Sequence, residues 1–271
     1  MTVGEPAVEL VELDWCGRRV RIEHEWIGRR RAGRPLLVFL HEGLGSRSMW
    51  RDFPAELCDA GNYRGLVYSR PGYGGSTPRA LHEPLGVDFM QRQALEVLPA
   101  LRQALCIAEP VWLFGHSDGA SIALLYAAHH PETVAGAVLL APHVFVEPIS
   151  VQSIRQVRQA YGEGDLRQRL ARHHDDVDSA FWGWNDIWLH PDFLAWNIEA
   201  ELATIRCPLL TIQGIDDEYG TLEQIHRIAR ALPATRLLEL AQCAHSPHRD
   251  QPDQVIAAIV AFIDAARPRA A

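Results

Sequence analysis

The sequence predicts an α/β protein built on a mostly parallel sheet that carries an inserted helical segment. Short, nearly continuous apolar runs alternate with helical stretches along most of the 271 residues. Such runs, interleaved with helices, are typical of a parallel sheet whose two faces are both covered. One gap, from Ala141 to Cys207, spans about 60 residues and is too long for a simple crossover, so it predicts an insertion.

The predicted sheet begins with an antiparallel hairpin. Alternating segments at 8–15 and 20–27 flank the turn sequence Cys16-Gly17-Arg18-Arg19. Six apolar runs follow, at 36–40, 65–68, 111–114, 134–140, 208–212 and 235–240. Helical patterns fill the gaps between them at 49–60, 89–105, 120–130, 222–231 and 253–266. We therefore expect an eight-stranded sheet flanked by helices.

The insertion has helical periodicity of its own, at 150–161, 165–173, 177–189 and 191–202. We predict that 142–203 forms a helical subdomain and that 1–141 and 204–271 together form the core domain. The insertion carries Trp182, Trp184, Trp188 and Trp196. These rings are expected to form the small core of the insertion, with one or two of them also facing a substrate pocket.

Composition excludes several classes of function. The chain is 48% hydrophobic and 22% charged, with a net charge of −8, which argues against nucleic-acid binding. It has no apolar run of about 18 residues and no signal-peptide pattern at the N-terminus, so we expect a soluble cytoplasmic protein that does not bind membranes. Five scattered cysteines suggest neither disulfides nor a zinc site. A homodimer stays open as an alternative to a monomer.

The most informative motif is Gly115-His116-Ser117-Asp118-Gly119, which lies between an apolar strand and a small-residue helix. A serine at the apex of so tight a turn needs very small residues two positions to either side, and Gly115 and Gly119 meet that need. Centring the turn on Asp118 would place His116 at a tight position where histidine does not fit. Ser117, rather than Asp118, is therefore the candidate nucleophile.

A serine hydroxyl needs a base, and the base needs an orienting acid. An acidic turn, Asp216-Asp217-Glu218, follows the strand at 208–212, at the sheet end where catalytic groups collect in open α/β folds. A histidine-bearing loop with His245 and His248 follows the last strand. The chain order is thus serine, acid, histidine.

In that order and context the sequence resembles the α/β-hydrolase superfamily over nearly its whole length. The resemblance rests on His41-Glu42-Gly43-Leu44-Gly45-Ser46, Arg70-Pro71-Gly72-Tyr73-Gly74-Gly75-Ser76, the serine turn, Gly214-x-x-Asp217 and Ala244-His245. It implies an α/β-hydrolase fold with a helical cap at 142–203, Ser117 as nucleophile, His245 as general acid/base and Asp217 as the orienting acid. Asp216 and Glu218 remain rivals to Asp217.

Acyl transfer also needs two backbone N–H groups for the oxyanion. The resemblance implies that Asp118 supplies one and that Gly43 or Leu44 supplies the other. Glu42 departs from the usual His-Gly-x-Gly pattern of this loop. It either forms an ion pair with Arg70 or Arg47, or places a carboxylate at the pocket mouth to bind a polar or cationic group.

Other residues are predicted to lie near the site and to support it or line its pocket. His41 and His116 are expected to form structural hydrogen bonds, and His248 to bond nearby backbone or Asp250. The candidates for the substrate pocket are Glu42, His143, Trp182, Trp184 and Trp188.

These inferences together predict a serine hydrolase, without metal or cofactor, that cleaves a small to medium, partly apolar carboxylic ester through an acyl-enzyme. Three alternatives stay open: a carbon–carbon hydrolase of the meta-cleavage type, a proline iminopeptidase-like amidase that uses Glu42, and a non-catalytic binding protein with this fold. No triad member is missing from the sequence, which favours an enzyme.

Overall fold

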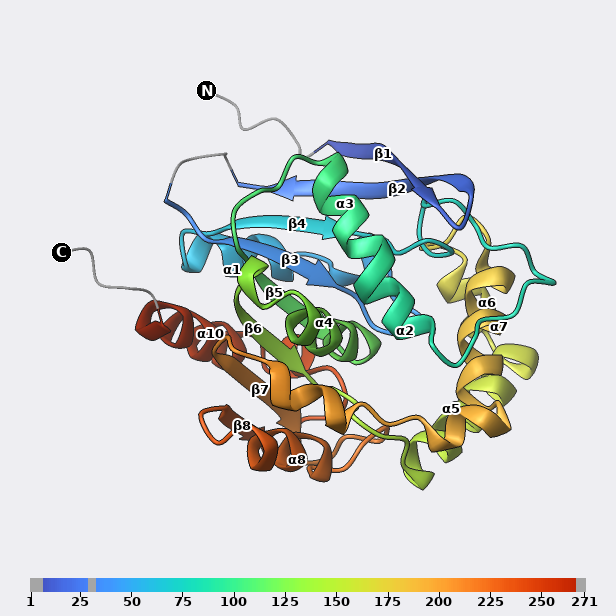
Figure 1. The fold of residues 1–271 in the computed structure, drawn as a ribbon. Coiled ribbons are helices and arrows are strands. Elements are labelled where there is room, and N and C mark those ends of the chain that lie inside the picture. The colour runs from blue at the N-terminus through green and yellow to red at the C-terminus, as the bar shows by residue number, and fades with distance from the viewer. Residues whose placement is uncertain (1–6, 29–32, 267–271) are drawn as a thin grey trace.

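A computed structural model describes residues 7–28 and 33–266, so the two ends of the predicted core domain lie partly outside the described residues. The described chain forms one eight-stranded sheet in the order β1-β2-β4-β3-β5-β6-β7-β8 (Figure 1). The predicted α/β-hydrolase fold, with its mostly parallel eight-stranded sheet, is confirmed.

An antiparallel hairpin forms one edge of the sheet. Strands β1 (Val8–Trp15) and β2 (Arg18–Ile27) pair from Trp15 opposite Arg18 to Val8 opposite Glu25. The turn residues Cys16 and Gly17 both have positive φ, of 55° and 69°, as expected for a tight two-residue hairpin turn. Strand β2 then pairs antiparallel with β4.

The other six strands are parallel to one another. They are β3 (Leu36–Leu40), β4 (Arg64–Tyr68), β5 (Val111–His116), β6 (Val134–Leu140), β7 (Leu209–Gly214) and β8 (Arg236–Leu240). Every residue of β3, β4, β5 and β7 is buried. Burial on both faces explains why these strands are continuous apolar runs rather than alternating patterns.

Helices cover both faces of the sheet (Figure 1). On one face lie α2 (Phe89–Arg92), α3 (Leu98–Ala104), α4 (Asp118–His129) and α8 (Glu223–Ala231). On the other lie α1 (Phe53–Ala60) and α10 (Pro252–Ala266), with the short α9 (Pro247–Asp250) before α10. The two apolar layers on either side of the sheet form the core of the molecule.

Two helices differ from their predicted form. The predicted helix at 49–60 is divided into a 3-10 turn, Arg47–Trp50, and α1. The predicted helix at 89–105 contains a π-helical turn, Gln93–Val97, between α2 and α3. Pro99 explains this interruption, because it has no N–H to donate within the helix and disturbs the preceding turn.

The segment between β6 and β7 is helical and lies beyond the carboxyl ends of the parallel strands (Figure 1). Its elements are α5 (Pro148–Glu163), α6 (Leu166–Leu170), α7 (Val177–Trp188) and two 3-10 helices, Pro191–Ala195 and Glu199–Thr204. The fourth predicted helix is therefore two 3-10 turns. Among all the helices described, none is long and apolar enough to cross a membrane.

Candidate active site

Ser117 occupies the turn between β5 and α4, where its φ is 53° and its ψ is −120°. A non-glycine residue in this left-handed region is strained, which is common at functional sites. A methyl group added at Gly115 would overlap the Gly119 carbonyl, and one added at Gly119 would overlap the Leu40 carbonyl. The predicted need for glycine at both positions is therefore confirmed.

A histidine and an acid meet across the loops that follow β8 and β7. The Nδ1 of His245 donates a hydrogen bond to the Oδ1 of Asp217, 2.8 Å away. Asp217 is 7% exposed, whereas Asp216 and Glu218 are both exposed. The backbone N–H of Tyr219 also donates to Asp217 Oδ1, at 2.8 Å. Of the three acids in this turn, Asp217 is the one bonded to the His245 imidazole.

Charges around His245 favour its protonated form. Burial alone would lower the pKa of His245, but the Asp217 carboxylate, with smaller contributions from Glu218 and Glu42, raises that pKa above its usual value. In turn, although burial opposes ionisation, His245 and the Tyr219 N–H lower the pKa of Asp217. The pair is thus arranged to stabilise an imidazolium, the state a general base reaches after taking a proton.

The ring of His245 lies beside Tyr219 and His116, with ring centroids 4.7 Å and 5.1 Å away. His245 is partly exposed, and Ser117 is 7% exposed. Among the described residues Ser117 Oγ has no hydrogen-bond partner. In enzymes without substrate the hydrogen bonds between catalytic groups are often long and tighten only in the substrate complex.

Two backbone segments, at the start of α4 and in the loop after β3, carry N–H groups that have no acceptor among the described residues. Asp118 is the first residue of α4, so its N–H has no acceptor within the helix. The Gly45 N–H donates to the Glu42 carbonyl at 3.0 Å, closing a turn whose central residues are Gly43 and Leu44. The N–H groups at the centre of such a turn point away from its internal hydrogen bond. This arrangement can bind an oxyanion.

The carboxyl group of Asp118 is buried and has two neighbours. Its Oδ1 accepts a hydrogen bond from the Trp188 indole at 3.2 Å, and its Oδ2 lies 4.0 Å from the Arg70 guanidinium. Burial raises the pKa of Asp118 to about 6, although Arg70 and Trp188 oppose that rise. Trp188 therefore links the helical insertion directly to the residue that follows Ser117.

The other expected pocket residues separate into two groups. The Trp184 indole packs against Gly43, where an added methyl group would overlap the indole. The ring of His143 lies 5.2 Å from that of Trp188 and 5.9 Å from that of His245, measured between centroids. Burial lowers the pKa of His143 to about 3, so its ring is neutral. Trp182 does not join them: its ring packs within the insertion, against Phe181 at 5.0 Å.

The expected ion pair of Glu42 with Arg70 or Arg47 is not formed. Arg70 donates to the Glu42 backbone carbonyl at 2.8 Å instead of pairing with its carboxylate. The carboxylate lies 3.6 Å from His116 Nδ1 and 3.6 Å from the Arg249 guanidinium. Arg47 pairs with Glu25 instead. Arg249 thus already offers a positive charge to the Glu42 carboxylate from within the protein.

The surroundings of the other histidines are also clear. As expected, His41 and His116 make structural hydrogen bonds: His41 accepts from the Arg70 N–H at 3.0 Å, and His116 donates to the His245 carbonyl at 2.7 Å. The expectation for His248 was wrong. Both of its ring nitrogens are buried and have no hydrogen-bond partner among the residues that the structure describes, and the ring packs 4.9 Å from that of Trp50.

Two contacts of the site were not anticipated from the sequence. His174, in the insertion, accepts from the Gly74 N–H and donates to the Leu44 carbonyl, both at 3.0 Å, so it ties two loops of the core together. The Tyr219 ring flanks His245. Tyr219 directly follows the acidic turn, and its position next to that turn is a sequence signal for a residue of the site. No sequence pattern around His174 indicates that it contacts the core. No group of three or more His, Cys, Asp or Glu among the described residues is arranged to hold a metal ion.

Comparison with known proteins agrees with this geometry. A model of the alpha/beta hydrolase family matches residues 37–258, most of the chain. The protein belongs to the α/β-hydrolase family. Among related structures, a thermophilic esterase from Thermogutta terrifontis superposes with a TM-score of 0.75 at 18% identity, covering 97% of this chain and 100% of that one.

Two sequence relatives of this α/β-hydrolase carry different activities in their names. A 2-succinyl-6-hydroxy-2,4-cyclohexadiene-1-carboxylate synthase from Enterobacter sp. (strain 638) is 28% identical over 162 residues, which is 58% of this chain and 55% of that protein. A 2-hydroxy-6-oxo-6-phenylhexa-2,4-dienoate hydrolase from Comamonas testosteroni is 24% identical over 246 residues, covering 80% of this chain and 84% of that one. The family and its hydrolase members make this protein a hydrolase, while the bond it cleaves is a separate question.

Proposed function

We propose that the protein is a serine hydrolase that cleaves small to medium, partly apolar carboxylic esters through an acyl-enzyme intermediate. The observation that carries the proposal is the hydrogen bond from His245 Nδ1 to Asp217 Oδ1, 2.8 Å long, in a chain whose Ser117 stands on a strained turn. A buried acid that fixes the histidine tautomer leaves Nε2 free to accept a proton, as a serine nucleophile requires.

In the proposed mechanism Ser117 Oγ attacks the ester carbonyl carbon while His245 Nε2 takes the hydroxyl proton. The N–H groups of Asp118 and of Gly43 or Leu44 bind the resulting oxyanion. His245 then gives its proton to the departing alcohol, which leaves Ser117 acylated. A water molecule, deprotonated by His245, attacks the acyl group and releases the carboxylic acid, and the proton returns to Ser117.

The insertion at 142–203 is proposed to act as a cap that shapes the substrate pocket. Trp184 against Gly43 and Trp188 beside His143 supply an apolar ceiling near the proposed oxyanion site. Large aromatic rings favour a substrate with a partly apolar body, because burying such a body against them is favourable. We propose no pocket role for Trp182, which packs inside the insertion.

Carbon–carbon bond hydrolysis is a second candidate, favoured by the similarity to the Comamonas testosteroni hydrolase over 80% of this chain. An amidase that binds a substrate ammonium through Glu42 is disfavoured, because the Arg249 guanidinium already lies 3.6 Å from that carboxylate.

The deciding experiment is a screen of p-nitrophenyl esters of graded acyl length, together with a dienoate ring-cleavage product. We expect ester hydrolysis and covalent labelling by a fluorophosphonate probe, both lost in Ser117→Ala and both kept in Cys106→Ala, which removes an exposed nucleophile before β5. Turnover of the dienoate without turnover of any ester would replace the ester proposal by the second candidate. No labelling and no turnover would indicate a non-catalytic binding protein.

A further inference from the structure

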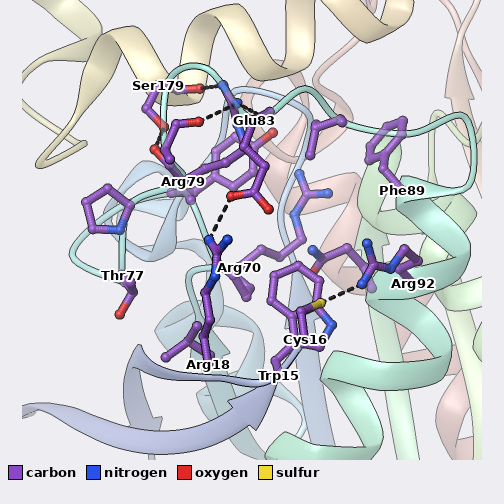
Figure 2. Close-up of a pocket in the computed structure, with 18 of the residues that line it drawn as sticks. Trp15, Cys16, Arg18, Arg70, Thr77, Arg79, Glu83, Phe89, Arg92 and Ser179 are labelled. Carbon is purple, nitrogen blue, oxygen red and sulfur yellow. Dashed lines mark hydrogen bonds and ion pairs between the residues drawn. The ribbon is translucent and has the colours of Figure 1, made fainter.

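A cavity lies between the β1–β2 turn, the loop after β4, α2 and α7, and Ser117, Asp217 and His245 are not among the residues that line it (Figure 2). Its volume is about 160 Å³. Of the described residues that line it, five are arginines, Arg18, Arg19, Arg70, Arg79 and Arg92, and one, Glu83, is acidic. In a chain with a net charge of −8, this concentration of guanidinium groups calls for an explanation.

The carboxylates of the protein do not fully balance these charges. The Arg79 guanidinium donates to the backbone carbonyls of Ala80, Glu83 and Ser179, and it forms no ion pair among the described residues. The buried Arg70 reaches a carboxylate only at 4.0 Å, that of Asp118. At 4.0 Å this contact is too long for a hydrogen bond, so the charge of Arg70 is only partly balanced.

The remaining pairs stand at the exposed rim of the cavity. Arg18 reaches Glu83 at 2.8 Å, Arg92 reaches Glu96 at 3.2 Å and Arg19 reaches Glu12 at 3.4 Å, and all six side chains are more than 40% exposed. Ion pairs of this kind contribute little and exchange partners readily. A ligand carboxylate can therefore compete for these guanidinium groups at small cost.

The cavity also has an apolar wall and an unsatisfied polar group. Trp15 and Phe89 line it, and the Arg92 guanidinium stacks 5.3 Å above the Trp15 ring. Gln93 lines it too, is only 6% exposed, and has a buried Oε1 without a hydrogen-bond partner among the described residues. This oxygen can only accept, so a carboxylate cannot satisfy it; the group of Gln93 that can donate to a carboxylate is the amide nitrogen of the same side chain.

We propose that this cavity binds a small organic carboxylate, with the charged group at Arg79 and Arg92 and an aromatic or short aliphatic body against Trp15 and Phe89. A cavity of about 150 Å³ accommodates a benzene ring, so the volume suits one ring or its aliphatic equivalent. Guanidinium groups recognise carboxylates through paired, charge-assisted hydrogen bonds, and Gln93 can donate through its amide nitrogen.

Two sources can supply this carboxylate: the substrate itself, or a separate small molecule. The cavity adjoins the candidate active site, because Arg70 lines it and also contacts Asp118, the residue after Ser117. Ser179, on the same helix as Trp184 and Trp188, forms part of its wall.

The test is calorimetric titration of Ser117→Ala protein with benzoate, which measures binding independently of hydrolysis. We expect saturable binding of benzoate and no binding of the neutral analogue benzamide. Arg79→Gln and Arg92→Gln, each made in the same background, should weaken benzoate binding at least about tenfold. The matched control is Arg230→Gln on α8, which should bind benzoate as the parent does. A variant that unfolds is recognised by its melting curve, and Arg92, at the exposed rim, provides the second variant.

Two exposed thiols give an independent readout. Cys16 lines the cavity and bonds the Arg92 guanidinium, whereas Cys106 lies elsewhere (Figure 2). Benzoate should slow alkylation of Cys16 by iodoacetamide and leave Cys106 unaffected, as measured by mass spectrometry of the two peptides. No saturable benzoate binding, equal binding of benzamide, or equal weakening in Arg230→Gln would overturn the proposal.

A second pair of measurements distinguishes the two sources of the carboxylate. The active enzyme is assayed with a p-nitrophenyl monoester of a dicarboxylic acid and with the corresponding neutral methyl ester. If Arg92→Gln lowers kcat/KM only for the acidic ester, the site holds the substrate's own carboxylate. If both esters react as in the parent while benzoate binding is lost, the site holds a separate carboxylate. Should no ester be hydrolysed, benzoate binding still decides this proposal separately from the proposed function.

Discussion

The His116 imidazole donates through Nε2 to the backbone carbonyl of His245, 2.7 Å away. A carbonyl can only accept, so the proton of a neutral His116 ring stands on Nε2. Nδ1 then faces Glu42 Oε2 at 3.6 Å. The residue before Ser117 thus connects the Glu42 carboxylate to the loop that carries His245.

The first prediction concerns the charge of Glu42. This carboxylate contributes to the raised pKa of His245, so Glu42→Gln should lower that pKa. A general base acts in its neutral form, and activity therefore rises with pH through the pKa of the base. We expect the acidic limb of the kcat/KM profile to move to lower pH, because one negative charge near the imidazole is removed.

Glu201→Gln is the matched control for this change, because Glu201 forms a glutamate–histidine pair with His129. Its profile should coincide with that of the parent. An acidic limb that stays in place or moves to higher pH in Glu42→Gln would show that Glu42 does not act on His245.

The second prediction separates the acids of the turn after β7. Asp217→Asn removes the carboxylate bonded to His245 and permits the wrong imidazole tautomer, so kcat should fall by about 10³- to 10⁴-fold. Asp216 is exposed, and Asp216→Asn should stay within about twofold of the parent, as is usual for surface changes. Ester assays at saturating substrate measure both. A large loss in Asp216→Asn with a small one in Asp217→Asn would reverse the assignment.

Much of the fold was predictable because burial leaves a periodic signal. A continuous apolar run such as 36–40 buries the side chains on both of its faces only in a sheet that is covered on both sides. The glycines of the serine turn are required because a larger side chain would overlap neighbouring backbone atoms. The division of the helix at 89–105 was not predicted, because π-helical turns are rare and a single residue, Pro99, decides this one locally.

The sequence predicted those residues of the candidate site that belong to local motifs. It did not predict contacts between residues that are far apart in the chain. The sequence restricted the candidates for the orienting acid to the three acidic residues of one turn. Only burial and the hydrogen bond to His245 distinguish Asp217 from its neighbours. The partners of Glu42, at positions 116 and 249, are far away in the chain, so no local pattern reports them. The arginine-lined cavity is likewise assembled from four separate segments.

The third prediction is a pH dependence of stability that arises from Asp118. Its pKa of about 6 in the folded protein exceeds the ordinary value of 3.8, so the folded state holds this proton more tightly than the unfolded state does. Stability therefore falls as pH rises between those two values, by about 2 to 3 kcal/mol in total. Asp118→Asn cannot ionise and should lack this fall.

Urea denaturation at about pH 4.5 and about pH 7 measures this effect. The free energy of unfolding of Asp118→Asn, relative to the parent, should increase by about 2 kcal/mol between the two conditions. Asp59→Asn, which changes an exposed carboxyl on α1, should show no such increase. A constant difference for Asp118→Asn would mean that the buried carboxyl ionises as it does in the unfolded chain.

The fourth prediction tests how closely the insertion approaches the proposed oxyanion loop. A methyl group at Gly43 would overlap the Trp184 indole, so Gly43→Ala must displace either the ring or the loop. Displacing a backbone donor by even about 1 Å lowers catalysis by roughly 10²-fold, and we expect a loss of that size in kcat/KM. Trp184→Leu removes the obstacle, and the double variant should therefore regain at least about tenfold over Gly43→Ala alone.

This recovery is what distinguishes crowding from other effects of the alanine. If Gly43→Ala acted only by restricting the backbone of the loop, the leucine would leave the loss unchanged, and the two substitutions would be additive. Melting curves of all three variants show whether each is folded at the assay temperature. Esters with bulkier acyl groups should also gain relative to small ones in Trp184→Leu, because the smaller side chain widens the space above Gly43. Additive losses, together with an unchanged order of ester preference, would place Trp184 outside the substrate pocket.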